Sequence, residues 1–157
     1  MKKILFSIFT LSMASCTWDE IDVPPTPTYY EIWSGPTISF TKESGADPTN
    51  SSNQDQITPS VSITRGNDGG QIYNAVSETQ AEESSSPIGT EWAIGDTSEI
   101  ENLIFEPFRR AVGKPKKVVG KKLVLHIIEE DVYMSVEFTS WASGKLGGFG
   151  YIRSSEN

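Results

Sequence analysis

The sequence predicts an all-β domain, an antiparallel β-sandwich or jelly roll with one short helix. Apolar and polar residues alternate along 132–139, which is typical of a strand with one buried face. The apolar run at 123–128 has the length of a buried strand, and the short connection between these two segments favours antiparallel pairing. The turn sequence N-D-G-G at 67–70 lies between two more alternating segments, which predicts a hairpin over 61–76.

Other patterns predict the remaining elements. Alternation and aromatic residues indicate further strands at 37–41, 91–94 and 149–151. Asp96 followed by Glu99 is a helix N-cap signal. Residues 106–112 are predicted to form about two helical turns that end at Gly113. Short strands joined by polar loops are the pattern of a sandwich.

The N-terminal segment 1–15 has the composition of a bacterial lipoprotein signal peptide. Lys2 and Lys3 form a positive region, and the apolar segment 4–13 is too short to span a bilayer as a helix. The sequence M-A-S-C that ends at Cys16 resembles a lipobox. This resemblance implies cleavage before the cysteine, a diacylglycerol on its thiol and a further acyl chain, such as palmitate, on its new amino group. The alternative is an ordinary signal peptide followed by an incidental cysteine.

Residues 16–35 are predicted to be a lipid-anchored tether, because prolines favour extended polyproline geometry. The prolines are Pro24, Pro25 and Pro27. Acidic residues follow Cys16 closely, and in Bacteroidetes-type lipoproteins such acids resemble a signal for export to the outer face of the outer membrane. We therefore expect a lipid-anchored outer-membrane protein that faces the cell exterior, with its β-sandwich domain at 36–157. A merely solvated linker is the alternative.

The charge distribution is uneven. A formal net charge of −8 disfavours nucleic acid as a partner, because phosphate binding needs clustered cations. Seven of the 13 Lys and Arg residues nevertheless lie in one segment; they are Arg109, Arg110, Lys114, Lys116, Lys117, Lys121 and Lys122. Such a patch is suited to an acidic polysaccharide, a lipopolysaccharide or an acidic protein. The alternative is a solvated face that balances acidic neighbours within the domain.

The sequence contains no recognisable catalytic constellation, so we expect a protein that is not an enzyme and has no cofactor. His126, the sole histidine, lies in a predicted buried strand and is expected to be a core or sheet residue rather than a base. With Cys16 lipidated, no zinc site of the Cys/His kind remains. The carboxylates Glu129, Glu130 and Asp131 lie on a predicted turn, where solvated acids are expected, and they carry no glycosidase signal.

The loops raise the question of calcium, which prefers oxygen ligands. Suitable side chains are Asp47, Asn53, Asp55, Asn67 and Asp68. These residues lack EF-hand spacing, and Asp and Asn are also the ordinary residues of turns. No metal site is predicted, and bound calcium stays an open alternative.

Four aromatic residues are candidate platforms for stacking on sugar rings; they are Trp92, Tyr133, Trp141 and Tyr151. In a regular strand, Tyr133 and Trp141 point away from the face that carries Val132 and Phe138. The alternative is that a second layer or the glycine-rich loop covers these rings.

The stretch EEDVYMSVEFTSWASGKLGGFGYIRS at 129–154 resembles a recurrent all-β domain in secreted and surface proteins of Bacteroidetes-type bacteria. Its pattern is an acid, an aromatic strand, F-T-S-W, a glycine-rich loop and F-x-Y-x-R-S. The earlier pieces GPTISFTKESGADPT, NQDQIT, TRGNDGGQIYN and SPIGTEWAIG are also similar to that domain, so the resemblance covers 35–154. It implies export and display, and no particular chemistry.

These expectations together describe a cell-surface lipoprotein whose domain is a non-enzymatic binding or adhesion module, with a glycan as the candidate ligand. The alternative is an accessory or structural subunit of an outer-membrane assembly, which contacts protein through a sheet edge or the basic patch. A hydrolase of another type would need carboxylates that converge on a groove.

Overall fold

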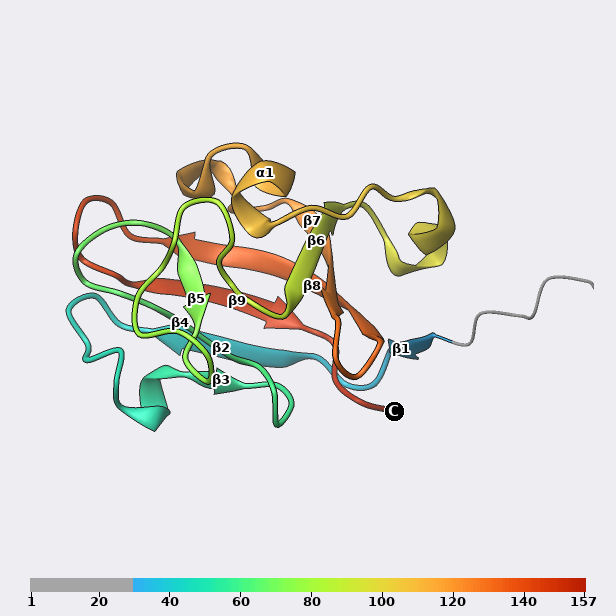
Figure 1. The fold of residues 1–157 in the computed structure, drawn as a ribbon, viewed down its shortest axis with the longest axis horizontal. Helices are drawn as coiled ribbons and strands as arrows, with labels where there is room; N and C mark the ends of the chain where they lie inside the picture. The colour runs from blue at the N-terminus through green and yellow to red at the C-terminus, as the bar shows by residue number, and fades with distance from the viewer. Residues whose placement is uncertain (1–29) are drawn as a thin grey trace, which may run out of the picture.

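The computed structural model describes residues 30–157, and its fold is all-β with two sheets, as predicted (Figure 1). The signal peptide, Cys16 and most of the predicted tether lie outside these residues. The strands are β1 (Glu31–Trp33), β2 (Ile38–Lys42), β3 (Asp55–Gln56), β4 (Ser62–Arg65), β5 (Ile72–Asn74), β6 (Thr90–Ile94), β7 (Lys122–Ile127), β8 (Val132–Trp141) and β9 (Phe149–Arg153).

The larger sheet runs in the order β2-β9-β8-β7-β6 and is antiparallel apart from β1, which also pairs with β8. The predicted antiparallel pairing of β7 with β8 is confirmed, with His126 opposite Tyr133. The predicted alternation along β8 is confirmed as well. Its inward-facing side chains are buried; they are Val132, Met134, Val136 and Phe138.

The smaller sheet, β3-β4-β5, lies against the larger sheet (Figure 1). Its β4–β5 hairpin confirms the prediction for 61–76. The fully buried side chains of Val61, Ile63 and Ile72 meet those of β7, β8 and β9 in one core. Burial of each such side chain contributes about 1.5–3 kcal/mol, so the packing of the two sheets against each other strongly stabilises the fold.

One α-helix, α1 (Phe108–Val112), is present in the described part of the chain, and it lies within the predicted helix at 106–112. It ends at Gly113, whose φ of 76° suits a residue without a Cβ. The Phe108 ring packs edge-on against Trp92, with ring centroids 5.1 Å apart. The helix therefore covers the end of the core beside β6.

Short 3-10 helices complete the secondary structure; they are η1 (Ser51–Asn53), η2 (Thr97–Asn102) and η3 (Pro115–Lys117). The side chain of Asp96 accepts a hydrogen bond from the Ser98 backbone N–H at 3.0 Å. The N-cap signal in the sequence thus marks the start of a 3-10 helix. None of the helices between residues 30 and 157 is both long enough and apolar enough to cross a membrane.

β1 lies inside the segment predicted to be tether, which corrects the domain boundary placed at residue 36. It pairs in parallel with the start of β8, and Glu31 lies opposite Val132. Because β7 occupies the other edge of β8, β1 lies on the edge that β9 uses further along. Tyr30 also packs edge-on against Tyr133, with ring centroids 5.4 Å apart. Tyr30 and Trp33 therefore belong to the domain.

Candidate functional site

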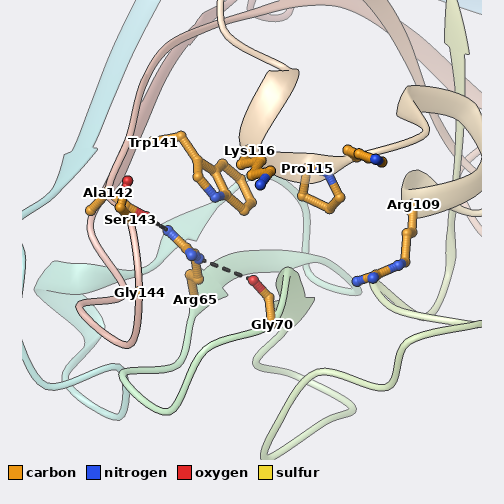
Figure 2. A pocket seen from close by; sticks show the side chains of 10 residues that line it. Arg65, Gly70, Arg109, Pro115, Lys116, Trp141, Ala142, Ser143 and Gly144 are labelled. Carbon is orange, nitrogen blue, oxygen red and sulfur yellow. Dashed lines mark hydrogen bonds between the residues drawn. The ribbon is translucent and has the colours of Figure 1, made fainter.

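An open groove of about 520 Å³ lies where four segments meet (Figure 2). Its volume is within the range of ligand-binding pockets, about 300–1,000 Å³. Arg65 comes from the end of β4 and Gly70 from the hairpin turn. The other lining residues come from α1, from the η3 region and from the end of β8 with the loop that follows; they are Arg109, Lys114, Pro115, Lys116, Trp141, Ala142, Ser143 and Gly144.

Arg65 is the most deeply buried cation of the groove, with 3% of its surface exposed. Its Nη1 donates to the carbonyl oxygens of Ala142 at 3.0 Å and Gly148 at 2.9 Å, and its Nε donates to that of Gly70 at 3.4 Å. The guanidinium carbon lies 4.1 Å from the centroid of the Trp141 ring, a cation–π contact (Figure 2). Arg65 thus ties the β4–β5 turn to the β8–β9 loop.

The positive charge of Arg65 has no carboxylate partner within the described residues. Lys42 is a second buried cation, 1% exposed, and its Nζ donates to Asn67 Oδ1 at 3.0 Å and to the Gly147 carbonyl at 3.3 Å. Burial lowers the pKa of Arg65. Burial, and next the charge of Arg65, lower the pKa of Lys42, while Asp47 opposes them. Buried charges are usually paired, so two neighbouring cations held by neutral oxygens favour an anion nearby.

The rim of the groove adds further positive charge. Arg109 forms an ion pair with Glu83 at 3.0 Å. Lys114 and Lys116 are exposed and form no ion pair within residues 30–157. No Asp or Glu side chain lines the groove, and three of its four cations, Arg65, Lys114 and Lys116, have no carboxylate partner within the described residues.

The structure does not bring the seven predicted patch residues together. Only Arg109, Lys114 and Lys116 line the groove. The others lie elsewhere. Arg110 pairs with Glu106 at 3.1 Å, Lys121 donates to the Val112 carbonyl at 2.8 Å, Lys122 lines a different pocket beside Asp96, and Lys117 is exposed outside the groove. The basic segment is thus divided, and part of it is used within the domain.

Sequence reasoning missed Arg65, although the strand pattern carried a signal. Arg65 has the parity of Val61 and Ile63, so it takes an inward position where an apolar residue is expected. Lys42 continues the parity of Phe40 in β2 in the same way. A charged residue at an inward position near a strand end was the available indication of a buried cationic site.

The prediction that Trp92 and Tyr151 are sugar-stacking platforms is wrong, because both residues are 1% exposed. Trp92 packs on Phe108, and its Nε1 donates to Thr90 Oγ1 at 2.9 Å. The Tyr151 hydroxyl donates to Asp55 Oδ2 at 2.6 Å. Both rings are part of the core.

The predicted orientation of Trp141 is wrong as well. The register between β8 and β9 shifts after Phe138, which pairs with Tyr151, whereas Ser140 pairs with Gly150. This bulge adds one residue to β8 and turns Trp141 to the inner face. One face of its ring lies against Arg65, and the Phe108 ring stacks at 6.2 Å, so Trp141 is not an open platform. Its Nε1 has no hydrogen-bond partner among residues 30–157.

Tyr133 faces outward as predicted, but other rings cover it. It stacks on His126 at 4.1 Å and meets the edges of Phe105 and Tyr30. His126 is the sheet residue that was expected, and its Nε2 lies 3.0 Å from Asp131 Oδ1. Neither residue lines the groove.

The candidate calcium ligands and the turn carboxylates are used within the domain or lie on a turn. Asp55 forms a buried ion pair with Arg153, Asp47 accepts hydrogen bonds from Thr49, and Asn67 binds Lys42. Glu129, Glu130 and Asp131 lie on the turn between β7 and β8, as predicted. Between residues 30 and 157, no group of three or more His, Cys, Asp or Glu side chains is placed to hold a metal ion.

A scan against protein-family models, a search of curated proteins and a search of solved structures each found no match. The class of protein is therefore defined by the fold and the groove. It is an all-β domain with a cationic groove lined by the β4–β5 hairpin, α1, the η3 region and the β8–β9 loop.

Proposed function

We propose that this protein is a cell-surface lipoprotein whose all-β domain is a non-enzymatic binding module for acidic glycans. The observation that carries the proposal is the groove, which is lined by Arg65, Arg109, Lys114 and Lys116 and by no Asp or Glu side chain. Of these four cations, only Arg109 has a carboxylate partner within the described residues, Glu83. A cleft lined by one sign of charge concentrates ligands of the opposite sign. An acidic chain supplies the counter-charge that Arg65 lacks.

The groove supports recognition by charge rather than by ring stacking. The Arg65 guanidinium already lies over the Trp141 ring, and the Phe108 ring is 6.2 Å away, so little aromatic surface is left for a neutral sugar ring. We therefore expect acidic glycans to bind and neutral ones to be ignored. Binding should weaken with added salt, because exposed charges are screened.

The direct test is binding of the full-length protein, extracted in detergent, to an array of neutral and acidic glycans. Two adjacent lysines provide a matched pair of variants, since both are exposed and only Lys116 lines the groove. Lys116→Glu should shorten retention on an acidic-polysaccharide column more than Lys117→Glu does. Equal effects of the two variants, or no effect of Lys116→Glu, would show that the groove is not the binding site.

The lipid anchor is supported by the signal sequence and the lipobox-like M-A-S-C, both of which precede the described residues. Acyl chains contribute about 0.8 kcal/mol for each buried methylene, so two or more chains hold a protein stably on a membrane. Cys16→Ser should move the protein from the membrane fraction to the soluble fraction. A variant that remains membrane-bound and processed as before would refute lipidation.

One observation favours the second candidate, an accessory subunit of an outer-membrane assembly. β2 pairs only with β9 within the described residues, so its other edge offers unpaired backbone groups. Ser39 and Thr41 on this strand are exposed, and its lysine points inward. A photocrosslinker attached at Ser39→Cys should capture a protein neighbour in isolated outer membranes if this candidate is right, and none if the glycan is the sole partner.

A further inference from the structure

The hydrogen-bonding capacity of Arg65 limits which anion the groove can recognise. Arginine usually binds a carboxylate through two parallel N–H groups, either Nε with one Nη or the two Nη atoms together. In Arg65, Nε is engaged by Gly70, and Nη1 is engaged by both Ala142 and Gly148. Both bidentate arrangements are therefore blocked. Only Nη2 makes no hydrogen bond within the described part of the chain.

The remaining donors are single and come from different elements. The Trp141 indole N–H has no partner within residues 30–157, and its ring lies against the Arg65 guanidinium. Lys114 and Lys116 add ammonium groups from the η3 region. An indole N–H and an ammonium group donate and do not accept. Donors that approach from several directions suit an anion whose oxygens also point in several directions.

We infer, resting on the proposed function, that the groove selects glycans that carry a tetrahedral oxyanion ester over glycans that carry a carboxylate. A sulfate ester presents three terminal oxygens and no proton at neutral pH. A phosphate monoester offers the same shape, with a second pKa near 6. The planar uronate carboxylate cannot use its two-oxygen edge on Arg65, because no free N–H pair faces it.

The test compares matched polymers with the full-length protein in detergent. Dextrans of one chain length are substituted to the same charge density with sulfate, phosphate or carboxymethyl groups, and an unsubstituted dextran is the blank. We expect the sulfate or the phosphate polymer to bind at least about tenfold more tightly than the carboxymethyl polymer, a difference of about 1.4 kcal/mol. Whichever of the sulfate and phosphate polymers binds more tightly shows whether the preferred group is a sulfate ester or a phosphate ester.

The outcomes separate this inference from the proposed function. Equal binding of the sulfate, phosphate and carboxymethyl polymers would overturn the inference and leave an acidic-glycan module in place. Binding of none of the polymers would overturn the inference and the proposed function together.

A second measurement isolates the indole N–H. Trp141→Phe keeps an aromatic ring against Arg65 and removes the donor, so affinity for the sulfate polymer should fall by a larger factor than affinity for the carboxymethyl polymer. Trp33→Phe is the matched control, because the Trp33 Nε1 donates to Glu31 outside the groove. The melting temperature of each variant shows whether the fold is retained. If Trp141→Phe destabilises the fold, Lys116→Gln and Lys117→Gln are compared instead. The readout is then the ratio of sulfate affinity to carboxymethyl affinity, which should fall for Lys116→Gln and stay the same for Lys117→Gln. If Trp141→Phe lowered the affinity for the sulfate and carboxymethyl polymers by the same factor, the indole N–H would have no role in selecting the sulfate ester.

Discussion

Arg153 on β9 holds Asp55 on β3 with two hydrogen bonds, from Nε to Oδ2 at 2.7 Å and from Nη2 to Oδ1 at 3.0 Å. Tyr151 donates its hydroxyl to the same carboxylate at 2.6 Å. The pair joins the smaller sheet to the larger one, and both side chains are more than nine-tenths buried. Unlike Arg65, this buried arginine has its counter-charge inside the fold, which indicates a structural role.

Asp55→Asn should lower the free energy of unfolding by about 3–5 kcal/mol, because it leaves the Arg153 cation buried without a counter-charge. Denaturant titration measures the change. Asp68→Asn is the control, since Asp68 is exposed on the hairpin turn and its substitution should change stability by less than about 0.5 kcal/mol. A loss below about 1 kcal/mol for Asp55→Asn would mean that the pair does not hold the sheets together.

Tyr151 should make stability fall at alkaline pH. Burial, and next the charge of Asp55 and the hydrogen bond to it, raise the pKa of Tyr151 well above its ordinary value. Below about pH 10 the tyrosine is protonated in both the folded protein and the unfolded chain, so its contribution to the free energy of unfolding is fully present. Above about pH 10 the unfolded chain loses a proton that the folded protein keeps, and the free energy of unfolding decreases as pH rises toward the folded pKa.

The measurement is denaturant unfolding of the wild type and of Tyr151→Phe at several values above pH 10. The wild type should lose stability more steeply, by up to about 1.4 kcal/mol per pH unit. The difference between the two proteins removes the contribution of other titrating groups. Parallel curves would show that Tyr151 ionises as easily in the folded protein as in the unfolded chain.

Gly150 should be intolerant of a side chain because it lies opposite the β8 bulge. A Cβ there would lie 2.9 Å from Ser140 Oγ, 3.1 Å from Thr41 Oγ1 and 3.2 Å from the Phe40 carbonyl oxygen. Gly150→Ala should lower the free energy of unfolding by about 1–3 kcal/mol. Adding Ser140→Ala should restore part of the lost stability, since it removes the Oγ atom that lies nearest to the new Cβ. An alanine variant as stable as the wild type would argue against the close approach at the bulge.

The strands that the sequence predicted well are those with strict periodicity. The inward and outward positions of β8 follow directly from its alternation up to Phe138. The prediction fails at Trp141, because the extra residue of the bulge reverses the inward and outward positions of every later side chain in β8. The residues F-T-S-W contain no pattern that indicates a bulge. β3 is also not predictable from the sequence, since Asp55 and Gln56 are too short a segment to show any period.

The candidate site was less predictable than the fold because it depends on segments that are distant in the sequence. The basic segment contributed Arg109, Lys114 and Lys116, which periodicity cannot place relative to Arg65. Only the packing of α1 and η3 beside the hairpin turn brings these side chains together. The meeting of Arg65 with Trp141 depends on the bulge as well. The strand pattern indicates that Arg65 is buried, but it does not indicate which residues surround it.

Arg65→Lys should weaken both the loop and the groove. Lysine keeps the charge but has one terminal nitrogen, so it cannot reproduce the fork of bonds to Gly70, Ala142 and Gly148. We expect a loss of about 1–3 kcal/mol in the free energy of unfolding, because buried carbonyl groups lose their donors. Amide hydrogen exchange at 142–148 should become faster, and binding to the acidic polymer should weaken.

Arg110→Lys is the control for this substitution, since Arg110 is exposed on α1 and pairs with Glu106 at 3.1 Å, its one ion-pair partner within residues 30–157. Its stability should change by less than about 0.5 kcal/mol, with no change in exchange at 142–148 or in binding. If Arg65→Lys kept full loop protection and full binding, charge alone would explain the role of Arg65. The bonds from its guanidinium to the β8–β9 loop would then not be what shapes the groove.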